Sequence, residues 1–131
     1  MAARQRRCNL AVSVLLAEDS ETLRRVMLRH LESHSEIAVV AEAKDFSSAV
    51  RLAEQLRPDV ILLDLRMKDS HGLDALAAGP KLISTGATIL AISFGVDDDA
   101  RALAKQIGAS KLLDKMSLYT ELIPTILGLK K

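Results

Sequence analysis

Asp64 ends a run of apolar residues in the stretch VILLDL, which spans residues 60–65. A continuous apolar run of this length is typical of a strand covered on both faces of its sheet. A carboxylate is costly inside such a layer unless a partner compensates it or the strand carries it to an edge. Ligands of open parallel sheets bind at the carboxyl ends of the strands. The run therefore predicts that Asp64 lies at the mouth of a site and not in the core.

Three other apolar runs end in groups whose chemistry matches that of Asp64. Glu18 and Asp19 follow SVLLA, Ser93 ends ATILAIS, and Lys115 follows KLLD. If the first strand lies beside the third, the three carboxylates converge, and their mutual repulsion favours a bound cation. Oxygen ligands in an incomplete protein shell suit Mg²⁺, which keeps water molecules and accepts a phosphoryl oxygen as a further ligand.

The lysine and the serine extend this chemistry toward phosphoryl transfer. Lys115 brings a positive charge suited to a phosphoryl group, and the Ser93 hydroxyl can donate a hydrogen bond to it. With Asp64 as nucleophile, this set can accept a phosphoryl group. Each residue alone also has an ordinary interpretation, because acidic pairs cap turns, serines end strands and lysines are solvated. Their occurrence at the ends of four separate strands favours a shared site.

Apolar runs alternate along the chain with segments of helical periodicity. The predicted strands are residues 13–17, 37–43, 60–65, 87–93 and 111–114. The predicted helices are residues 21–33, 47–56 and 73–78, one that starts at residues 97–99 and closes at Gly108, and one within residues 117–129. This alternation predicts βαβ units with right-handed crossovers and a mostly parallel sheet.

Three helix boundaries depend on single residues. Ser47 is a candidate N-cap for the second helix. The third helix is expected to end at Gly79-Pro80. Pro124 falls inside the last helix, which must therefore start late or bend.

The composition describes one ordinary globular domain. Of 131 residues, 49% are hydrophobic and 27% are charged, and the net charge is +1, which does not favour nucleic acid or a membrane as a partner. No apolar stretch has the length of a membrane span, the first residues are not typical of a secretory signal, and a lone Cys8 excludes an intrachain disulfide. We expect a cytoplasmic protein with an N-terminal tail at residues 1–11 and one domain at residues 12–131.

Four stretches carry a resemblance to a known family: VLLAEDSETLRRVMLRHLE, PDVILLDLRMKDSHGLDAL, ATILAIS and GASKLLDK. In order and spacing they are similar to the receiver domain of bacterial two-component response regulators. The similarity is greatest to the branch that usually carries a helix-turn-helix DNA-binding domain, and it extends from about Val12 to Leu127. It implies an α/β fold, the flavodoxin-like (βα)5 three-layer sandwich with parallel sheet order 2-1-3-4-5.

The resemblance also implies a phosphoacceptor switch. Asp64 would take a phosphoryl group from a histidine kinase or phosphotransfer protein in a Mg²⁺-dependent reaction. Asp19, Asp64 and the backbone carbonyl of Arg66 would bind Mg²⁺ directly, and Glu18 would act through water.

The remaining site residues would serve the phosphorylated state. Ser93 would follow the phosphoryl group, and Lys115 would pair with it. Arg66 and Gly95 occupy positions that the resemblance links to the rate of hydrolysis. Such a domain is no turnover enzyme, because it catalyses only its own phosphorylation and dephosphorylation.

Four residues depart from the family pattern. Phe94 stands where a small residue usually leaves the phosphorylation site open, and Leu112 stands where an aromatic side chain usually switches. Met116 replaces the proline that usually follows the lysine, and Lys68 replaces a proline after the phosphoacceptor, which would loosen that loop. These departures predict that the phosphoacceptor chemistry survives with an atypical output.

Two other functions stay open. One is a phosphorylation-independent receiver that acts as a protein-binding module, which the departures at Phe94, Leu112 and Met116 favour. The other is a phosphohydrolase with an aspartyl nucleophile, which usually needs a second aspartate where this chain has Arg66.

Two expectations concern partners. The fourth and fifth helices, where Arg101, Lys105 and Asp97 to Asp99 give a mixed-charge face, are candidates for a homodimer contact. Direct DNA binding by these residues is not expected, since the chain contains no helix-turn-helix segment.

Overall fold

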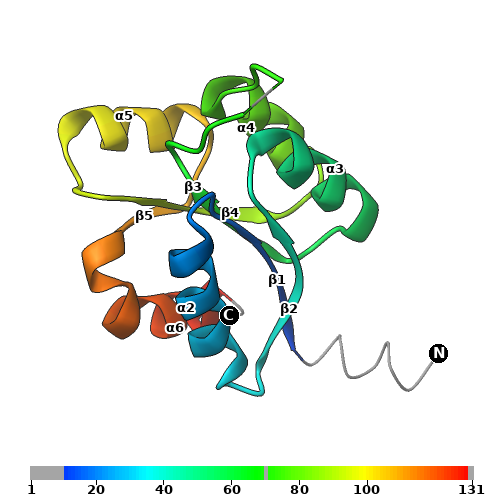
Figure 1. Cartoon of the computed structure of the whole chain (residues 1–131), viewed down its shortest axis with the longest axis vertical. Helices are drawn as coiled ribbons and strands as arrows, with labels where there is room; N and C mark the ends of the chain where they lie inside the picture. Colours follow the sequence, from blue (N-terminus) through cyan, green and yellow to red (C-terminus); the bar gives the residue numbers. More distant parts are fainter. Residues whose placement is uncertain (1–10, 70, 130–131) are drawn as a thin grey trace.

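The computed structural model describes residues 11–69 and 71–129, which form one parallel five-stranded sheet between two layers of helices (Figure 1). The strands are β1 (Val12–Ala17), β2 (Ile37–Ala43), β3 (Val60–Asp64), β4 (Thr88–Ser93) and β5 (Lys111–Asp114). Their order in the sheet is β2-β1-β3-β4-β5, so the predicted flavodoxin-like order is confirmed. The predicted tail at residues 1–11 lies outside the described residues, apart from Ala11, and stays a prediction.

Helices cover both faces of the sheet (Figure 1). One face carries α2 (Glu21–Glu32) and α6 (Leu118–Leu129), and the other carries α3 (Phe46–Leu56), α4 (Ala75–Ile83) and α5 (Asp98–Gln106). No helix among the described residues has both the length and the apolar character needed to span a membrane.

The central strand β3 supplies both cores, because successive side chains of a strand point to opposite faces. Ile61 and Leu63 are buried in the core beneath α3, α4 and α5, and Leu62 is buried in the core beneath α2 and α6. Strand β3 pairs with β1 on one side and with β4 on the other. Both faces of β3 are therefore covered by helices, as its continuous apolar run predicts.

Asp45, and not Ser47, caps helix α3. The Asp45 carboxylate accepts a hydrogen bond from the Ser48 backbone N–H at 2.8 Å, and the helix begins at Phe46. The predicted cap was wrong, because Asp45 takes this role and the buried Phe46 is the first residue of the helix. Ser47 instead donates its hydroxyl to Asp69 of the β3–α4 loop at 2.8 Å.

Helix α4 continues through Gly79-Pro80, so the prediction that this pair ends the helix was wrong. Proline removes one backbone donor, but the carbonyl that loses its partner belongs to the exposed Leu76, which faces water. Gly79 serves close packing, because a Cβ atom there would lie 2.7 Å from the Ile107 Cβ at the end of α5. The helix starts at Ala75 after its N-cap Asp74 and ends at Ile83.

The last helix starts early. A short 3₁₀ helix, η1 (Lys115–Ser117), leads directly into α6 at Leu118, which excludes the late start that Pro124 suggested. Pro124 is exposed, as is Thr120, whose carbonyl loses its usual donor. The predicted features of α5 are present, since Asp97 caps it and Gly108 follows it with a positive φ of 83°.

Candidate functional site

The carboxyl edge of the sheet collects the residues that the sequence singles out. Glu18 and Asp19 follow β1, Asp64 is the last residue of β3, Ser93 is the last of β4, and Lys115 follows β5. Because β1, β3, β4 and β5 are neighbours in a parallel sheet, their carboxyl ends lie along one edge. The topology therefore explains how residues almost a hundred positions apart reach the same place.

Three carboxylates form a cluster at this edge. One oxygen atom from each of Glu18, Asp19 and Asp64 lies within 4.8 Å of the others. Glu18 and Asp64 are buried, whereas Asp19 is exposed. Hard oxygen donors at this spacing, open to solvent through Asp19, are the donor set that Mg²⁺ accepts.

Lys115 forms ion pairs with both buried acids. Its Nζ atom lies 2.9 Å from Glu18 Oε1 and 3.1 Å from Asp64 Oδ2, and only 6% of its side chain is exposed. Burial by itself would lower the pKa of Lys115, but the hydrogen bond that its ammonium donates to Glu18 and the negative charge of Asp64 outweigh burial and raise that pKa. The ammonium therefore stays charged and compensates the two buried acids.

Asp64 lies at the edge, as predicted, but it is also buried, with 4% of its side chain exposed. Its Oδ1 accepts a hydrogen bond from the Arg66 backbone N–H at 3.1 Å, and its Oδ2 accepts one from Lys115. The expectation that Asp64 avoids the interior was incomplete, since the Lys115 ammonium makes the burial tolerable.

Glu18 is the most deeply buried of the three acids. Its Oε2 accepts a hydrogen bond from the Ser20 backbone N–H at 2.9 Å, and burial raises its pKa against the opposing effect of Lys115. The nearby charge of Asp64 raises the pKa of Glu18 further. A buried acid whose pKa is raised, next to a second buried carboxylate and an exposed third, forms a site that gains from a divalent cation.

The Ser93 hydroxyl has no hydrogen-bond partner among the described residues, although the side chain is almost fully buried. A buried hydroxyl without a partner costs free energy, so its position needs a reason. Ser93 ends β4, the strand beside β3, so its hydroxyl is available to a group that arrives at Asp64.

The four departures from the family pattern have visible consequences. Phe94 is 64% exposed, and Lys115 Nζ lies 4.7 Å from the centre of its ring. Leu112 is half-buried and Met116 is exposed, with the Met116 N–H bound to Asp114 Oδ1 at 3.0 Å. Lys68 does not simply loosen its loop, because its N–H donates to Asp19 Oδ2 at 3.3 Å, a bond that proline cannot make.

The sequence reasoning missed two aspartates that hold the loops. Asp69 Oδ2 accepts from the Ser47 N–H at 3.0 Å, and Asp69 Oδ1 accepts from the His71 N–H at 2.8 Å, so the β3–α4 loop is tied to the start of α3. Asp114 Oδ1 accepts from the N–H groups of Gly95 and Met116, which joins the loops after β4 and β5. An aspartate directly before Lys115 was the available signal for the second.

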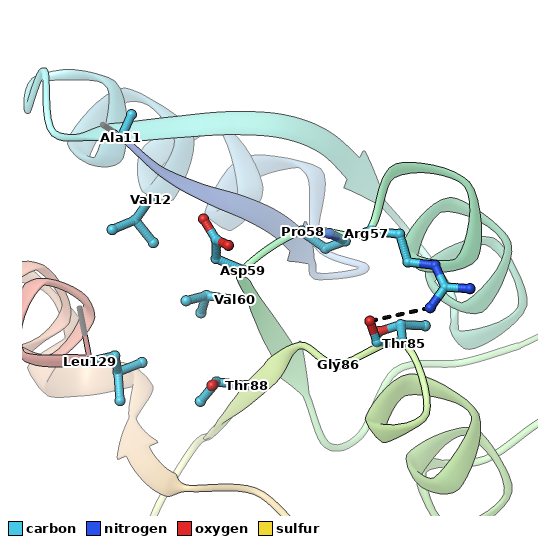
Figure 2. Close-up of a pocket in the computed structure, with 10 residues that line it drawn as sticks. All are labelled: Ala11, Val12, Arg57, Pro58, Asp59, Val60, Thr85, Gly86, Thr88 and Leu129. Atoms are coloured by element: carbon cyan, nitrogen blue, oxygen red, sulfur yellow. Dashed lines mark hydrogen bonds between the residues drawn. The ribbon is translucent and has the colours of Figure 1, made fainter. Parts of the chain in front are cut away.

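A pocket lies at the amino ends of the strands, at the end of the sheet opposite the acidic cluster (Figure 2). Its volume is about 480 Å³, and Arg57, Asp59 and Thr85 lie on its wall. These polar groups are satisfied within the protein: Asp59 Oδ2 accepts from the Ser13 N–H at 2.9 Å, and Arg57 donates to the Thr85 carbonyl at 3.4 Å. Both charged side chains on the described wall of this pocket therefore already have partners within the protein.

A parallel α/β domain with acids, a hydroxyl and a lysine at one sheet edge defines a recognisable class of protein. The family model of the response regulator receiver domain matches residues 14–127. The chain belongs to the response regulator receiver domain family.

Particular relatives narrow this class. The transcriptional regulatory protein LiaR of Bacillus subtilis is 37% identical over 120 residues, which are 92% of this chain and 56% of LiaR. A protein-glutamate methylesterase/protein-glutamine glutaminase of Anaeromyxobacter dehalogenans is 32% identical over 111 residues, 85% of this chain and 32% of that protein. This chain thus spans about half, or less, of the length of these curated relatives.

The solved structures agree with the family assignment. The signal receiver domain of the putative response regulator NarL from Mycobacterium tuberculosis superposes with a TM-score of 0.81 and 30% identity, over 91% of this chain and 95% of that one. A LuxR-family two-component response regulator from Aurantimonas has a TM-score of 0.80 and 27% identity, over 91% of this chain and 84% of that one. The predicted similarity to receivers of the DNA-binding branch is confirmed.

Proposed function

We propose that Asp64 is the phosphoacceptor of a two-component switch and takes its phosphoryl group from a phosphohistidine of a histidine kinase or phosphotransfer protein. The observation that carries this proposal is the cluster of Glu18, Asp19 and Asp64 within 4.8 Å, with Lys115 Nζ 3.1 Å from Asp64. A receiver domain that keeps every charged group of the site has the means for this chemistry.

The residues of the chain have distinct tasks in the transfer. An Asp64 oxygen forms a bond to phosphorus while the P–N bond of the phosphohistidine breaks, and the imidazole leaves with that electron pair. Lys115 pairs with the negative phosphoryl oxygens, and the unpartnered Ser93 hydroxyl donates to one of them. Asp19, Asp64 and the Arg66 carbonyl would hold Mg²⁺, with Glu18 acting through water, and the bound ion supplies further charge neutralisation.

Hydrolysis returns the switch to its resting state. Water attacks phosphorus, the bond to the Asp64 oxygen breaks, and inorganic phosphate leaves. Gly95 offers no side chain to orient that water, and the guanidinium of Arg66 pairs with Asp97 at 3.9 Å. The domain would therefore catalyse only its own phosphorylation and dephosphorylation.

The labelling experiment tests the acceptor directly. The protein is incubated with acetyl phosphate and Mg²⁺, and the modified residue is identified by mass spectrometry. Asp64→Asn should remove the label and keep the circular dichroism spectrum, whereas Asp98→Asn, at a fully exposed position, should label like the parent. Labelling that persists in Asp64→Asn would move the acceptor to another residue.

A second candidate function is a phosphorylation-independent binding module. The specific observations in its favour are the exposed Phe94 ring above Lys115 and the aliphatic Leu112 at the switch position. If the folded parent protein takes no label with acetyl phosphate and Mg²⁺, this function replaces the first.

An apolar groove next to the site suits the donor protein. Val26, Met116 and Tyr119 are more than half exposed and line a groove of about 130 Å³ between α2 and α6, which Lys115 also reaches. A phosphohistidine carrier that docks over Asp64 would lie next to this groove, and apolar side chains favour a helix with an apolar face as its contact. We also propose a homodimer contact through α5 and α6 and a cytoplasmic location.

Val26→Asp tests the groove. The charge should weaken transfer from a phosphorylated kinase tenfold or more, or about 1.4 kcal/mol, because it lies in the apolar contact. Labelling by acetyl phosphate should not change, since a small donor needs no groove. Equal loss with both donors would show that the substitution damages the site itself.

A further inference from the structure

Phe94 places an aromatic ring where the core does not need one. It follows Ser93 directly after β4, and 64% of its surface is exposed, so its ring is not held there by burial in either core. A polar or small residue at position 94 would expose less apolar surface to solvent. The position of the ring is therefore better explained by what it touches.

The ring touches the ammonium of Lys115. The Nζ atom lies 4.7 Å from the ring centre, within the range of about 6 Å over which the face of an aromatic ring attracts a cation. The same Nζ is also 2.9 Å from Glu18 Oε1 and 3.1 Å from Asp64 Oδ2. Two carboxylates and one ring thus enclose the ammonium, and little of the side chain meets water.

The restraint comes from a residue in a different loop. Lys115 is a long, flexible side chain at the start of η1, and Phe94 belongs to the loop after β4. Asp114 joins these two loops, because its Oδ1 accepts the N–H of Gly95 at 3.3 Å and that of Met116 at 3.0 Å. The backbone on either side of the ring–ammonium contact is therefore tied together.

We propose that Phe94 is a positioning residue that holds the Lys115 ammonium against Asp64 through a cation–π contact, so that the ammonium is in place when the phosphoryl group arrives. This inference rests on the proposed function of Asp64. Phosphoryl oxygens replace Asp64 Oδ2 as the partner of Lys115 after transfer, whereas the ring contact does not depend on either state. The ring thus stabilises the cation before and after the bond to phosphorus forms.

Steric obstruction makes the opposite prediction. If Phe94 only narrowed the entrance, its removal would speed labelling by acetyl phosphate. If it positions Lys115, Phe94→Ala should slow labelling by about fivefold, the worth of one cation–π contact with an exposed ring. Phe94→Leu should be as slow as Phe94→Ala, because leucine keeps bulk without a π face, and Phe94→Tyr should restore the rate.

The experiment combines these rates with a direct view of the lysine. Labelling rates with acetyl phosphate and Mg²⁺ are measured for the three variants and for Leu76→Ala, an exposed control on α4 that should match the parent. NMR of the Lys115 side chain, in protein free of divalent cations, should show ring-current-shifted CH₂ resonances that move toward random-coil values in Phe94→Ala and Phe94→Leu but not in Phe94→Tyr.

Two results would overturn the proposal: faster labelling of Phe94→Ala, or parent-like rates and Lys115 resonances in Phe94→Leu. Failure of the proposed function is distinguishable from both. In that case the parent itself takes no label on Asp64, while the Lys115 resonances of the unlabelled variants still report whether the ring holds the ammonium.

Discussion

At the scale of single residues, Ser93 carries a hydroxyl that the resting protein does not use. The group is buried and has no partner among the described residues, so it costs stability until an acceptor arrives. Thr85 offers a contrast, because its buried hydroxyl donates to the Leu82 carbonyl at 2.6 Å. The Thr85 hydroxyl therefore contributes to folding, whereas the Ser93 hydroxyl is free to serve the function.

Ser93→Ala should raise the free energy of unfolding by about 1 kcal/mol, because it removes an unpartnered polar group. It should also weaken the phosphorylated state, since the phosphoryl group loses a donor. Urea denaturation and the yield of labelled protein at steady state measure the two effects. As the matched control, Thr85→Val should lower the free energy of unfolding by about 1 kcal/mol and leave labelling unchanged.

At the scale of secondary-structure elements, the contact between α4 and α5 depends on a glycine. Gly79 lies inside α4, and an added Cβ atom would lie 2.7 Å from Ile107 Cβ and 3.1 Å from Ile107 Cα. Because one of these atoms belongs to the backbone of Ile107, a side-chain rotation cannot relieve the contact, and α4 and α5 would have to move apart. In the C-terminal turn of α6, Gly128 has no atom within 4 Å of the same added carbon.

Gly79→Ala should lower the free energy of unfolding by about 1–3 kcal/mol through overpacking. Gly128→Ala should raise it by about 0.5 kcal/mol, because alanine restricts the unfolded chain more and suits a helix better. Thermal denaturation of both variants checks the pair. A stabilised Gly79→Ala would mean that α4 and α5 do not pack this closely.

The same elements show where local patterns mislead. Gly79-Pro80 has the composition of a helix end, and Ser47 that of a cap, yet the structure uses the first for packing and the second to bind Asp69. The ends of the strands were predicted to within a residue or two, because each long apolar run stops where the chain leaves the sheet. The N-cap of α3 was harder to predict, because several polar residues lie next to one another and the helix begins with Phe46, a residue of the core.

At the scale of the whole molecule, binding of Mg²⁺ should stabilise the fold. A ligand that binds only the folded state adds about 2.7 kcal/mol at a concentration of about 100 Kd. The melting temperature should therefore rise with added Mg²⁺ and fall again with EDTA. Asp19→Asn, which removes the exposed acid of the cluster, should reduce the rise, while Asp98→Asn should not.

The Mg²⁺ effect should also depend on pH. Burial raises the pKa of Glu18, so the folded protein binds a proton in a range where the unfolded chain has already lost it. A proton on Glu18 opposes a cation, so the stabilisation by Mg²⁺ should grow as pH rises from about 5 to 7. A rise in melting temperature that is equal at both pH values would show that Glu18 does not take part.

Local order along the chain was enough to identify the strands, the parallel sheet and the edge at which Asp64, Ser93 and Lys115 belong, because hydrophobic period and strand ends are properties of short segments. Contacts between segments that are distant in the sequence could not be predicted from such local patterns. The ring of Phe94 over Lys115, the ties of Asp69 and Asp114, and the packing of Gly79 on Ile107 each join separate loops or helices. Such pairs arise only when the packed core sets the distance between those segments, which is why folding in three dimensions decided them.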